Sequence, residues 1–209
     1  MDTASFPHAL YHQIFDIKPG RGEARKVKIV EAFIDLVASD GIDHISFETL
    51  GKRVKMNRTH VAYYFANRDE LIRTAVRYAV AVGQHITIGH TQAATGWREK
   101  LECVVEGPFH WMERHPKHAS VMGLFYYLCS CDPSYRELQN SIRSMGEARI
   151  LSCLKGSGLG HKRSVEVARQ IQCLMAGVLN SFFSSDYPVP LAQLRRQTVK
   201  AAFDWVERG

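Results

Sequence analysis

Apolar side chains recur every three or four positions along most of the chain, and no segment shows the strict alternation that is typical of a β-strand. This spacing predicts a first helix over residues 25–39, and Gly41 is placed to end it because glycine readily adopts left-handed backbone. Later segments with the same periodicity predict an all-α protein with about nine helices.

Polar residues that suit helix N-termini mark the starts of the next three predicted helices. Ser46 stands three residues before Thr49 and opens a short segment that ends near Val54. Asn57 is a good N-cap for another short helix, whose apolar positions end at Phe65. A longer helix begins at Arg68, because the two acidic residues that follow it suit the positive end of a helix dipole.

The remaining chain is predicted to form five more helices, near residues 97–116, 121–132, 138–149, 164–183 and 191–206. The pair Gly107-Pro108 lies inside the first of them and predicts a kink or a break, because proline has no N–H to donate to the carbonyl of Val104. Glycines at positions 156, 158 and 160 interrupt the pattern, and Ser164 is expected to cap the helix that follows.

A length of 209 residues suits a small domain docked on a larger one. We predict an irregular N-terminal arm over residues 1–22, a three-helix helix-turn-helix domain over 23–70, and a helical bundle over 71–209. The arm contains Lys18 and Arg21, and basic arms of this kind sometimes reach a DNA minor groove. A tail without that role is the favoured interpretation.

Positive charge is concentrated in one short stretch of a chain whose formal net charge is +6. Between Gly51 and Arg68 there is no acidic residue, whereas acidic residues crowd the stretch just before it. A local excess of Lys and Arg is typical of a surface that binds phosphates. The basic residues of this stretch are Lys52, Arg53, Lys55, Arg58 and Arg68.

The chain contains no apolar run long enough to cross a bilayer, and its first twenty residues lack the apolar core of a signal peptide. Five scattered cysteines, an odd number, argue for reduced thiols. We therefore expect a cytoplasmic protein without a membrane partner.

The stretch from Ile29 to Leu71 resembles the DNA-binding domain of the TetR (tetracycline repressor) family. Three positions depart from the family pattern: Lys55 stands where glycine is usual, Ala62 where tyrosine is usual, and Tyr64 where histidine is usual. A lysine held in left-handed backbone would be strained by roughly 1 kcal/mol. The matching segments are Asp40-Gly41-Ile42, Ser46-Phe47-Glu48-Thr49-Leu50, Asn57-Arg58-Thr59, Tyr63-Tyr64-Phe65 and Arg68-Asp69-Glu70-Leu71.

The resemblance implies a sequence-specific regulator of transcription that binds double-stranded DNA. Arg58 and Thr59, at the start of the recognition helix, are expected to read bases, and arginine is the natural bidentate partner of guanine. Ser46 and Arg68, at helix N-termini, are expected to bind phosphate. The full set of expected DNA contacts is Ser46, Lys55, Arg58, Thr59, His60, Tyr63, Tyr64 and Arg68.

The resemblance also implies a repressor that a small effector releases from its operator. Most aromatic and Met side chains of the helical bundle are expected to form its core, but some of them could enclose an apolar or aromatic ligand. The candidate lining residues are Phe109, Trp111, Met112, Met122, Phe125, Tyr126, Met145 and Arg149.

A homodimer is expected because the segment 167–183 is apolar on more than one face, which exceeds what one buried stripe requires. The last two helices of each subunit would form a four-helix interface with twofold symmetry, and the operator would be an inverted repeat. The predicted interface residues are Leu174, Val178, Phe182, Leu194, Ala202 and Trp205.

Two other functions compete with this interpretation. One is an all-helical enzyme that uses Cys129 and Cys131 or the group around His110, although the sequence contains no catalytic motif. The other is a helix-turn-helix regulator that has no small ligand. We expect no catalytic residue and no cofactor. We also expect no metal site, since Pro116 separates His115 from His118 and disrupts helical ligand spacing.

Overall fold

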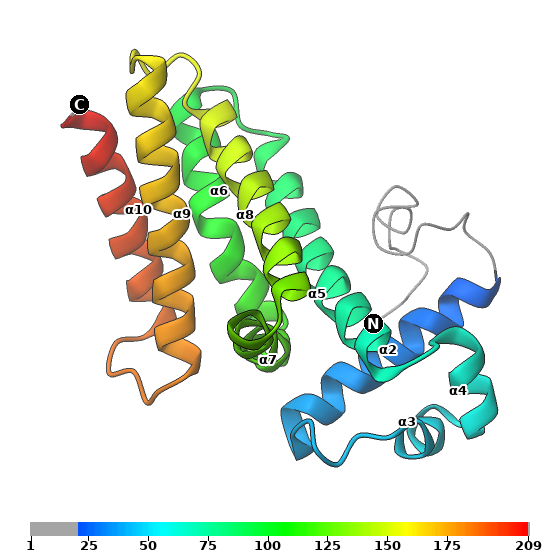
Figure 1. The fold of residues 1–209 in the computed structure, drawn as a ribbon. Helices are drawn as coiled ribbons and strands as arrows, with labels where there is room; N and C mark the ends of the chain where they lie inside the picture. Colours follow the sequence, from blue (N-terminus) through cyan, green and yellow to red (C-terminus); the bar gives the residue numbers. More distant parts are fainter. Residues whose placement is uncertain (1–20, 209) are drawn as a thin grey trace. The chain divides into compact units, whose positions relative to one another are not determined.

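The computed structural model describes residues 21–208, and these residues form nine helices and no strand (Figure 1). The predicted all-α class and the expected number of helices are therefore confirmed for this part of the chain. The helices divide into two compact units. Of the described residues, unit 1 comprises 21–82 and 116–125, and unit 2 comprises 83–115 and 126–208.

Unit 1 is built from α2 (Arg21–Asp40), α3 (Phe47–Val54), α4 (Arg58–Tyr64) and the first part of α5 (Arg68–Thr91). Helix α2 begins inside the segment that was predicted as an irregular arm, and residues 1–20 of that arm lie outside the described residues. Gly41 follows α2 with a φ of 75°, as its position predicted. The centre of the unit is fully buried and contains Ile29, Phe33, Leu50, Val61, Phe65 and Leu71.

Helix α7 (His118–Cys131) begins in unit 1 although it lies far along the chain. Lys117 Nζ forms an ion pair with Asp35 Oδ1 at 2.7 Å, across 82 residues of sequence. The buried ring of His118 contacts the ring of Tyr78 edge to face. These contacts attach residues 116–125 to α2 and α5, so the compact units do not follow the chain order of the predicted domains.

Unit 2 contains the second part of α5, the end of α7, and four complete helices: α6 (Trp97–Arg114), α8 (Pro133–Cys153), α9 (His161–Phe183) and α10 (Leu191–Glu207). Its core brings together apolar residues from all four complete helices. Fully buried members of this core include Leu101, Val105, Ile150, Ile171 and Ala202.

Helix α6 continues through Pro108, so the predicted break does not occur. Val105 and Phe109, on either side of the Gly-Pro pair, are fully buried, and their packing holds the helix together despite the missing hydrogen bond. Gly107 permits a close approach of α5 and α6. A Cβ at this glycine would lie 2.1 Å from Oγ1 of the buried Thr87.

Of the other predicted helix ends in this part of the chain, the one at Asp132-Pro133 agrees with the structure and the one at Ser164 does not. Asp132 Oδ1 accepts a hydrogen bond from the Ser134 amide at 2.8 Å, and Pro133 occupies the first turn of α8. The prediction that Ser164 caps the next helix is wrong, because α9 already begins at His161. The buried Ser164 hydroxyl instead donates to the Gly160 carbonyl four residues earlier, at 3.1 Å.

Within residues 21–208, no helix is both long and apolar enough to cross a membrane.

Candidate DNA-binding surface

The start of α3 is fixed by a reciprocal pair of hydrogen bonds. The Thr49 amide donates to Ser46 Oγ at 3.1 Å, and the Ser46 amide donates to Thr49 Oγ1 at 2.8 Å. This capping box satisfies two N–H groups that the helix itself leaves without partners. The polar residues of the sequence therefore predicted this start correctly.

The turn between α3 and α4 requires unusual backbone. Lys55 has φ 59° and ψ 44°, which is left-handed, so the expected strain of roughly 1 kcal/mol applies to it. The Met56 amide then donates to the Gly51 carbonyl at 2.8 Å. A Cβ at Gly51 would lie 2.6 Å from the Met56 carbonyl oxygen, so glycine is needed at that position for the turn to close.

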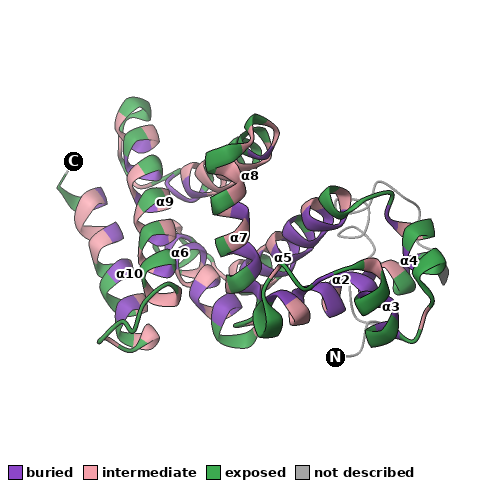
Figure 2. Ribbon diagram, turned by 60° about the horizontal axis from the view of Figure 1, so that its bottom comes forward, coloured by how far each residue is buried: buried purple, intermediate pink, exposed green. Residues whose placement is uncertain are grey.

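Helix α4 presents one face to the core and the opposite face to solvent. Asn57 Oδ1 accepts a hydrogen bond from the His60 amide at 2.7 Å, and the fully buried Val61 and Phe65 anchor the helix. Most of α3 and α4 is exposed (Figure 2). Tyr63 is 83% exposed, the largest exposed fraction among the exposed large hydrophobic side chains of the described residues.

Seven of the eight predicted DNA contacts are exposed on unit 1, and the eighth, Tyr64, is half-buried beside Tyr63. The two tyrosine rings meet edge to face, with their centroids 5.3 Å apart. Helix α4 therefore carries a contiguous outward surface of side chains that can donate, accept and stack. Its members are Arg58, Thr59, His60, Tyr63 and Tyr64.

A hollow of about 380 Å³ lies where the starts of α3, α4 and α5 converge. Ser46, Arg58 and Arg68 line it, together with Asn67. The Arg68 guanidinium also donates to the Ile42 carbonyl, which holds this side chain against the loop after α2. The sequence predicted separate roles for Arg58 and Arg68, and it gave no sign that the two arginines share one hollow.

Electrostatics reduce the number of free cations on this surface. Lys52 Nζ lies 2.9 Å from Glu48 Oε1. The hydrogen bond from Lys52 lowers the pKa of Glu48, and the charges of Lys52 and Arg58 lower it further. Glu48 therefore remains ionised at neutral pH and offsets the charge of Lys52. Among the described residues, Arg53, Lys55 and Arg58 have no ion pair.

The sequence did not indicate that Glu48 and Lys26 contribute to this surface. Glu48 was treated as part of an acidic stretch before the basic one, and its pairing with Lys52 depends on the helical spacing of α3. Lys26, from α2, lies over the Phe65 ring with Nζ 5.3 Å from the centroid. This contact adds a cation beside the end of α4 and joins residues that are far apart in the sequence.

The predicted ligand-lining residues divide between the two units. Phe109, Trp111 and Met112 are buried in unit 2, whereas Met122 and Phe125 are buried in unit 1. Tyr126 and Arg149 are half-buried in unit 2, and burial raises the pKa of Tyr126. Met145 is 47% exposed on the outer side of α8, so it contributes little to any enclosed space.

The predicted dimer residues behave in two ways. Leu194 and Ala202 are buried in the core of their own unit, which leaves them almost no surface for a partner. Leu174, Val178 and Phe182 are half-buried and follow one another at four-residue spacing along α9. Trp205 is half-buried on α10 and packs on the core of unit 2.

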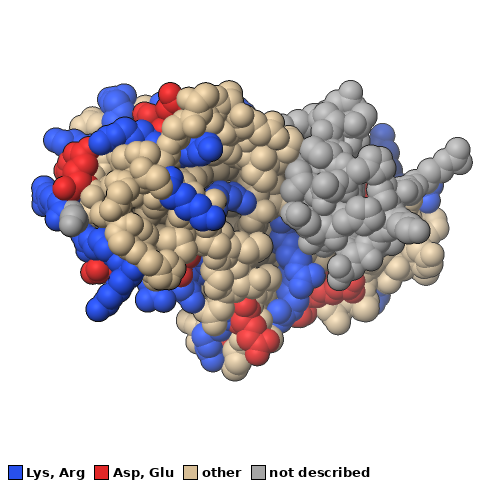
Figure 3. Space-filling view, turned by 90° about the horizontal axis from the view of Figure 1, so that it is seen from above, with Lys and Arg blue, Asp and Glu red and all other residues tan. Residues whose placement is uncertain are grey.

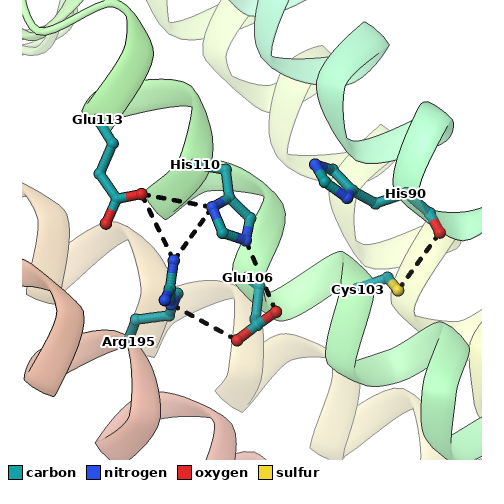
Figure 4. A network of polar contacts seen from close by, with 6 residues as sticks. All are labelled: His90, Cys103, Glu106, His110, Glu113 and Arg195. Carbon is teal, nitrogen blue, oxygen red and sulfur yellow. Dashed lines mark hydrogen bonds and ion pairs between the residues drawn. The ribbon is translucent and has the colours of Figure 1, made fainter.

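A second polar cluster lies in unit 2 and connects α6 to α10 (Figure 4). Arg195 Nη1 lies 3.1 Å from His110 Nδ1 and 3.4 Å from Glu113 Oε2, and Arg195 Nε lies 3.5 Å from Glu106 Oε1. The His90 ring stacks on the His110 ring at a centroid distance of 5.1 Å. The acidic and basic groups of this cluster therefore largely neutralise one another.

Cys129, one of the two cysteines that an enzyme could use, is not activated as a nucleophile. Burial raises the pKa of Cys129, whose Sγ donates to the Tyr135 carbonyl at 3.5 Å, so the thiol stays protonated. A nucleophilic cysteine needs the opposite shift. Within the described part of the chain, no group of three or more His, Cys, Asp and Glu side chains is arranged to hold a metal ion.

Comparisons with known proteins agree with this geometry at the level of the fold. No family model matches the sequence, and no curated protein matches it either. Many solved structures do match. A TetR transcription regulator from Haloarcula marismortui superposes with a TM-score of 0.76 at 9% identity, covering 89% of this chain and 98% of that one.

Two further structures agree. A TetR-like transcriptional regulator from Rhodococcus sp. RHA1 superposes with a TM-score of 0.71 at 14% identity, covering 91% of this chain and 99% of that one. A protein from Saccharomonospora viridis, described as a transcriptional regulator and solved in complex with choline, gives 0.74 at 16% identity, with 88% and 96% covered. This chain therefore has the fold of TetR-family transcriptional regulators.

Proposed function

We propose that this protein is a transcriptional regulator of the TetR type that binds operator DNA through α3 and α4. The observation that carries the proposal is the outward face of α4. Its side chains are exposed, the helix is fixed by the Asn57 cap and the buried Val61, and the basic residues that flank it have few acidic partners. The regulatory role of the proteins that share this fold supports the same conclusion.

In this proposal, α4 enters the major groove with its N-terminal residues nearest the base edges. Arg58 and Thr59 read bases, while Tyr63 contacts a phosphate or a thymine methyl group. Ser46 and Arg68 hold a phosphate near the hollow at the starts of α3 and α5, where amide N–H groups and arginine favour an anion. We also expect the protein to act in the cytoplasm.

The proposed regulator is a homodimer that binds an inverted repeat. Its interface is formed by the half-buried line of Leu174, Val178 and Phe182 on α9, with Trp205 on α10. We leave Leu194 and Ala202 out of the interface because both are buried within one chain. An apolar line that stays half-exposed along a helix is typical of a surface that a second subunit covers.

The proposed regulation is release from DNA by a small effector that binds in the C-terminal helices. Phe109, Trp111 and Tyr126 supply apolar surface near such a ligand, and Met145 is left out because it is exposed. The effector changes DNA affinity only if it binds the two states of the protein with different affinity. The choline-bound neighbour is one protein of this fold that holds a small molecule.

The test is selection of bound sequences from random duplex DNA, followed by affinity measurements on the selected site. Tyr63→Ala should weaken that affinity by about 10-fold or more, because it removes a hydroxyl contact and apolar area. Tyr127→Ala is a matched control, since Tyr127 is a 65% exposed tyrosine of unit 2. Selection of no sequence, or an equal loss with both variants, would contradict the proposal.

A further inference from the structure

One face of α8 carries apolar residues and one arginine. Tyr135, Leu138 and Ile142 lie on this face at helical spacing, and Cys153 continues it after Arg149. Tyr135 and Cys153 are buried, and Leu138 and Ile142 are half-buried. Arg149 is half-buried beside these positions, and the exposed Met145 lies one helical turn before it on the same side of the helix.

The other half-buried arginines of unit 2 all have a carboxylate partner. Arg143 Nη1 lies 2.5 Å from Glu147, Arg163 Nη1 lies 3.0 Å from Glu166, and Arg195 Nε lies 3.5 Å from Glu106. Among the described residues, Arg149 has no hydrogen bond and no ion pair. A half-buried cation without a partner is therefore an exception within this unit.

Two exposed arginines of this unit also have carboxylate partners. Lys and Arg side chains gather around the end of α10 and the start of α9 (Figure 3). Arg98 there pairs with Glu207 at 3.0 Å, and Arg208 pairs with Asp204 at 3.9 Å. Water already solvates those charges, whereas Arg149 loses part of its hydration and receives no carboxylate in return.

An arginine keeps its charge at every physiological pH, so Arg149 requires an anion rather than deprotonation. Burial lowers the pKa of Arg149, which supports the conclusion that its charged form is incompletely solvated. Because the guanidinium has a planar fork of donors, a carboxylate is the group that pairs with it most favourably.

We propose that the effector of this regulator is an organic acid whose single carboxylate pairs with Arg149, while its apolar body lies along the half-buried Leu138 and Ile142 of α8. This inference rests on the proposed function, because it names the chemical class of the effector. One guanidinium matches one negative charge, and a phosphate ester would require further donors. A cation such as choline would be repelled by Arg149.

The experiment uses the full-length protein and three acids of different shape: benzoate, phenylacetate and octanoate. Each is compared by titration calorimetry with its own amide, which has nearly the same shape but no charge. We expect at least one acid to bind about 10- to 100-fold more tightly than its amide, the range for hydrogen bonds to charged groups. Arg149→Gln should remove that difference.

Two variants make the test specific to Arg149. Arg149→Lys keeps the positive charge and should retain part of the preference for the acid. Arg143→Gln removes the neighbouring half-buried arginine of α8, which already pairs with Glu147, and should leave the preference unchanged. If Arg149→Gln does not fold, the comparison of Arg149→Lys with the unaltered protein still measures the dependence on this side chain.

The inference is overturned if none of the acids binds, if an acid and its amide bind equally, or if Arg149→Gln binds the acid as tightly as the unaltered protein. Failure of the proposed function looks different. In that case the unaltered protein selects no DNA sequence, whatever its affinity for acids. Acid binding without DNA selection would therefore retain the Arg149 site and contradict the regulator.

Discussion

Lys55 is the residue at which the sequence and the backbone disagree most directly. It is the only non-glycine residue of the described chain with a positive φ, and it stands in the turn that orients α4. A side chain with a Cβ destabilises left-handed backbone, whereas glycine adopts it without a penalty. The turn nevertheless closes, because the Met56 amide donates to the Gly51 carbonyl.

Lys55→Gly should therefore raise the free energy of unfolding by about 0.5–1 kcal/mol, because relief of the strain exceeds the added freedom of the unfolded chain. Chemical denaturation followed by circular dichroism measures the difference. Lys52→Gly is the control, since that residue is helical in α3 and glycine there should lower stability by about 1 kcal/mol. Equal destabilisation by both changes would show that the left-handed backbone of Lys55 stores no strain.

Arg58 and Arg68 should affect DNA binding differently although they line one hollow. Arg58→Ala should weaken binding to the selected site by about 1–3 kcal/mol per half-site and relax the preference at one base position. Arg68→Ala should weaken all sequences similarly and reduce the salt slope by about one unit per phosphate contact.

Affinities for the selected site and for a scrambled site, measured over a series of salt concentrations, separate the two roles. Arg68 also donates to the Ile42 carbonyl, so a melting curve for Arg68→Ala must accompany the binding data. Loss of base preference in Arg68→Ala, together with a uniform loss in Arg58→Ala, would reverse our orientation of α4 in the groove.

At the scale of elements, the sequence predicts best what neighbouring residues determine. The caps Ser46 and Asn57 and the end of α2 at Gly41 were all correct, because each depends on backbone groups within a few residues. Ser164 misled the prediction of a cap, and of the two outcomes predicted at Pro108, a kink or a break, the break does not occur. Tertiary packing contributes at both positions. Ser164 is buried, and α6 is held on both sides of Pro108 by buried neighbours.

Contacts between distant segments could not be predicted from a single sequence. The ion pair of Lys117 with Asp35 and that of Arg195 with Glu106 each join segments that are far apart in the chain. The exposed face of α4 was predicted because its residues resemble a known pattern. The shared hollow of Arg58 and Arg68, and the unpaired charge of Arg149, required the positions of side chains on different helices or turns.

The junction of α5, α6 and α10 should make the protein sensitive to acid. Burial lowers the pKa of His90 below its usual value of 6.5, and the charge of His110 lowers it further. The unfolded chain therefore binds a proton at His90 more readily than the folded chain does. The contribution of His90 to stability is thus greatest above pH 6.5 and decreases as the pH falls below that value.

His90→Gln should reduce this loss of stability between about pH 7 and pH 5.5, and thermal melts at several pH values measure it. His161→Gln is the control, because His161 lies at the start of α9, outside the stacked pair of His90 and His110. His115, whose pKa is also lowered by burial, will leave some acid sensitivity in His90→Gln. An unchanged pH profile in His90→Gln would contradict the assignment of this effect to His90.

At the scale of the whole molecule, two helices continue from one compact unit into the other. The division falls within α5, between Val82 and Gly83, and within α7, between Phe125 and Tyr126. We expect an effector to act on DNA affinity through α5 and α7.

Dimerisation and operator recognition should fail together when a charge is placed on α9. Val178→Glu would bury a carboxylate without a partner in the proposed interface, so we expect dimerisation to weaken by about 100-fold or more, equivalent to about 3 kcal/mol. Sedimentation at micromolar concentration measures this change. Asn180→Glu is the control, because it adds the same charge to the same helix at an exposed position.

Loss of the dimer should also change the form of DNA recognition. A twofold dimer places two copies of α4 in major grooves about one helical turn apart, or a small multiple of that distance, so its operator is an inverted repeat. A Val178→Glu monomer should bind the two half-sites separately and with similar affinity. It should lose the additional affinity that a dimer gains because its two DNA-binding units are linked. If Val178→Glu stays dimeric, the interface lies elsewhere. If it becomes monomeric and still binds the full repeat as tightly as the unaltered protein, the two half-sites are recognised independently. In that case the symmetry of the dimer does not determine the operator.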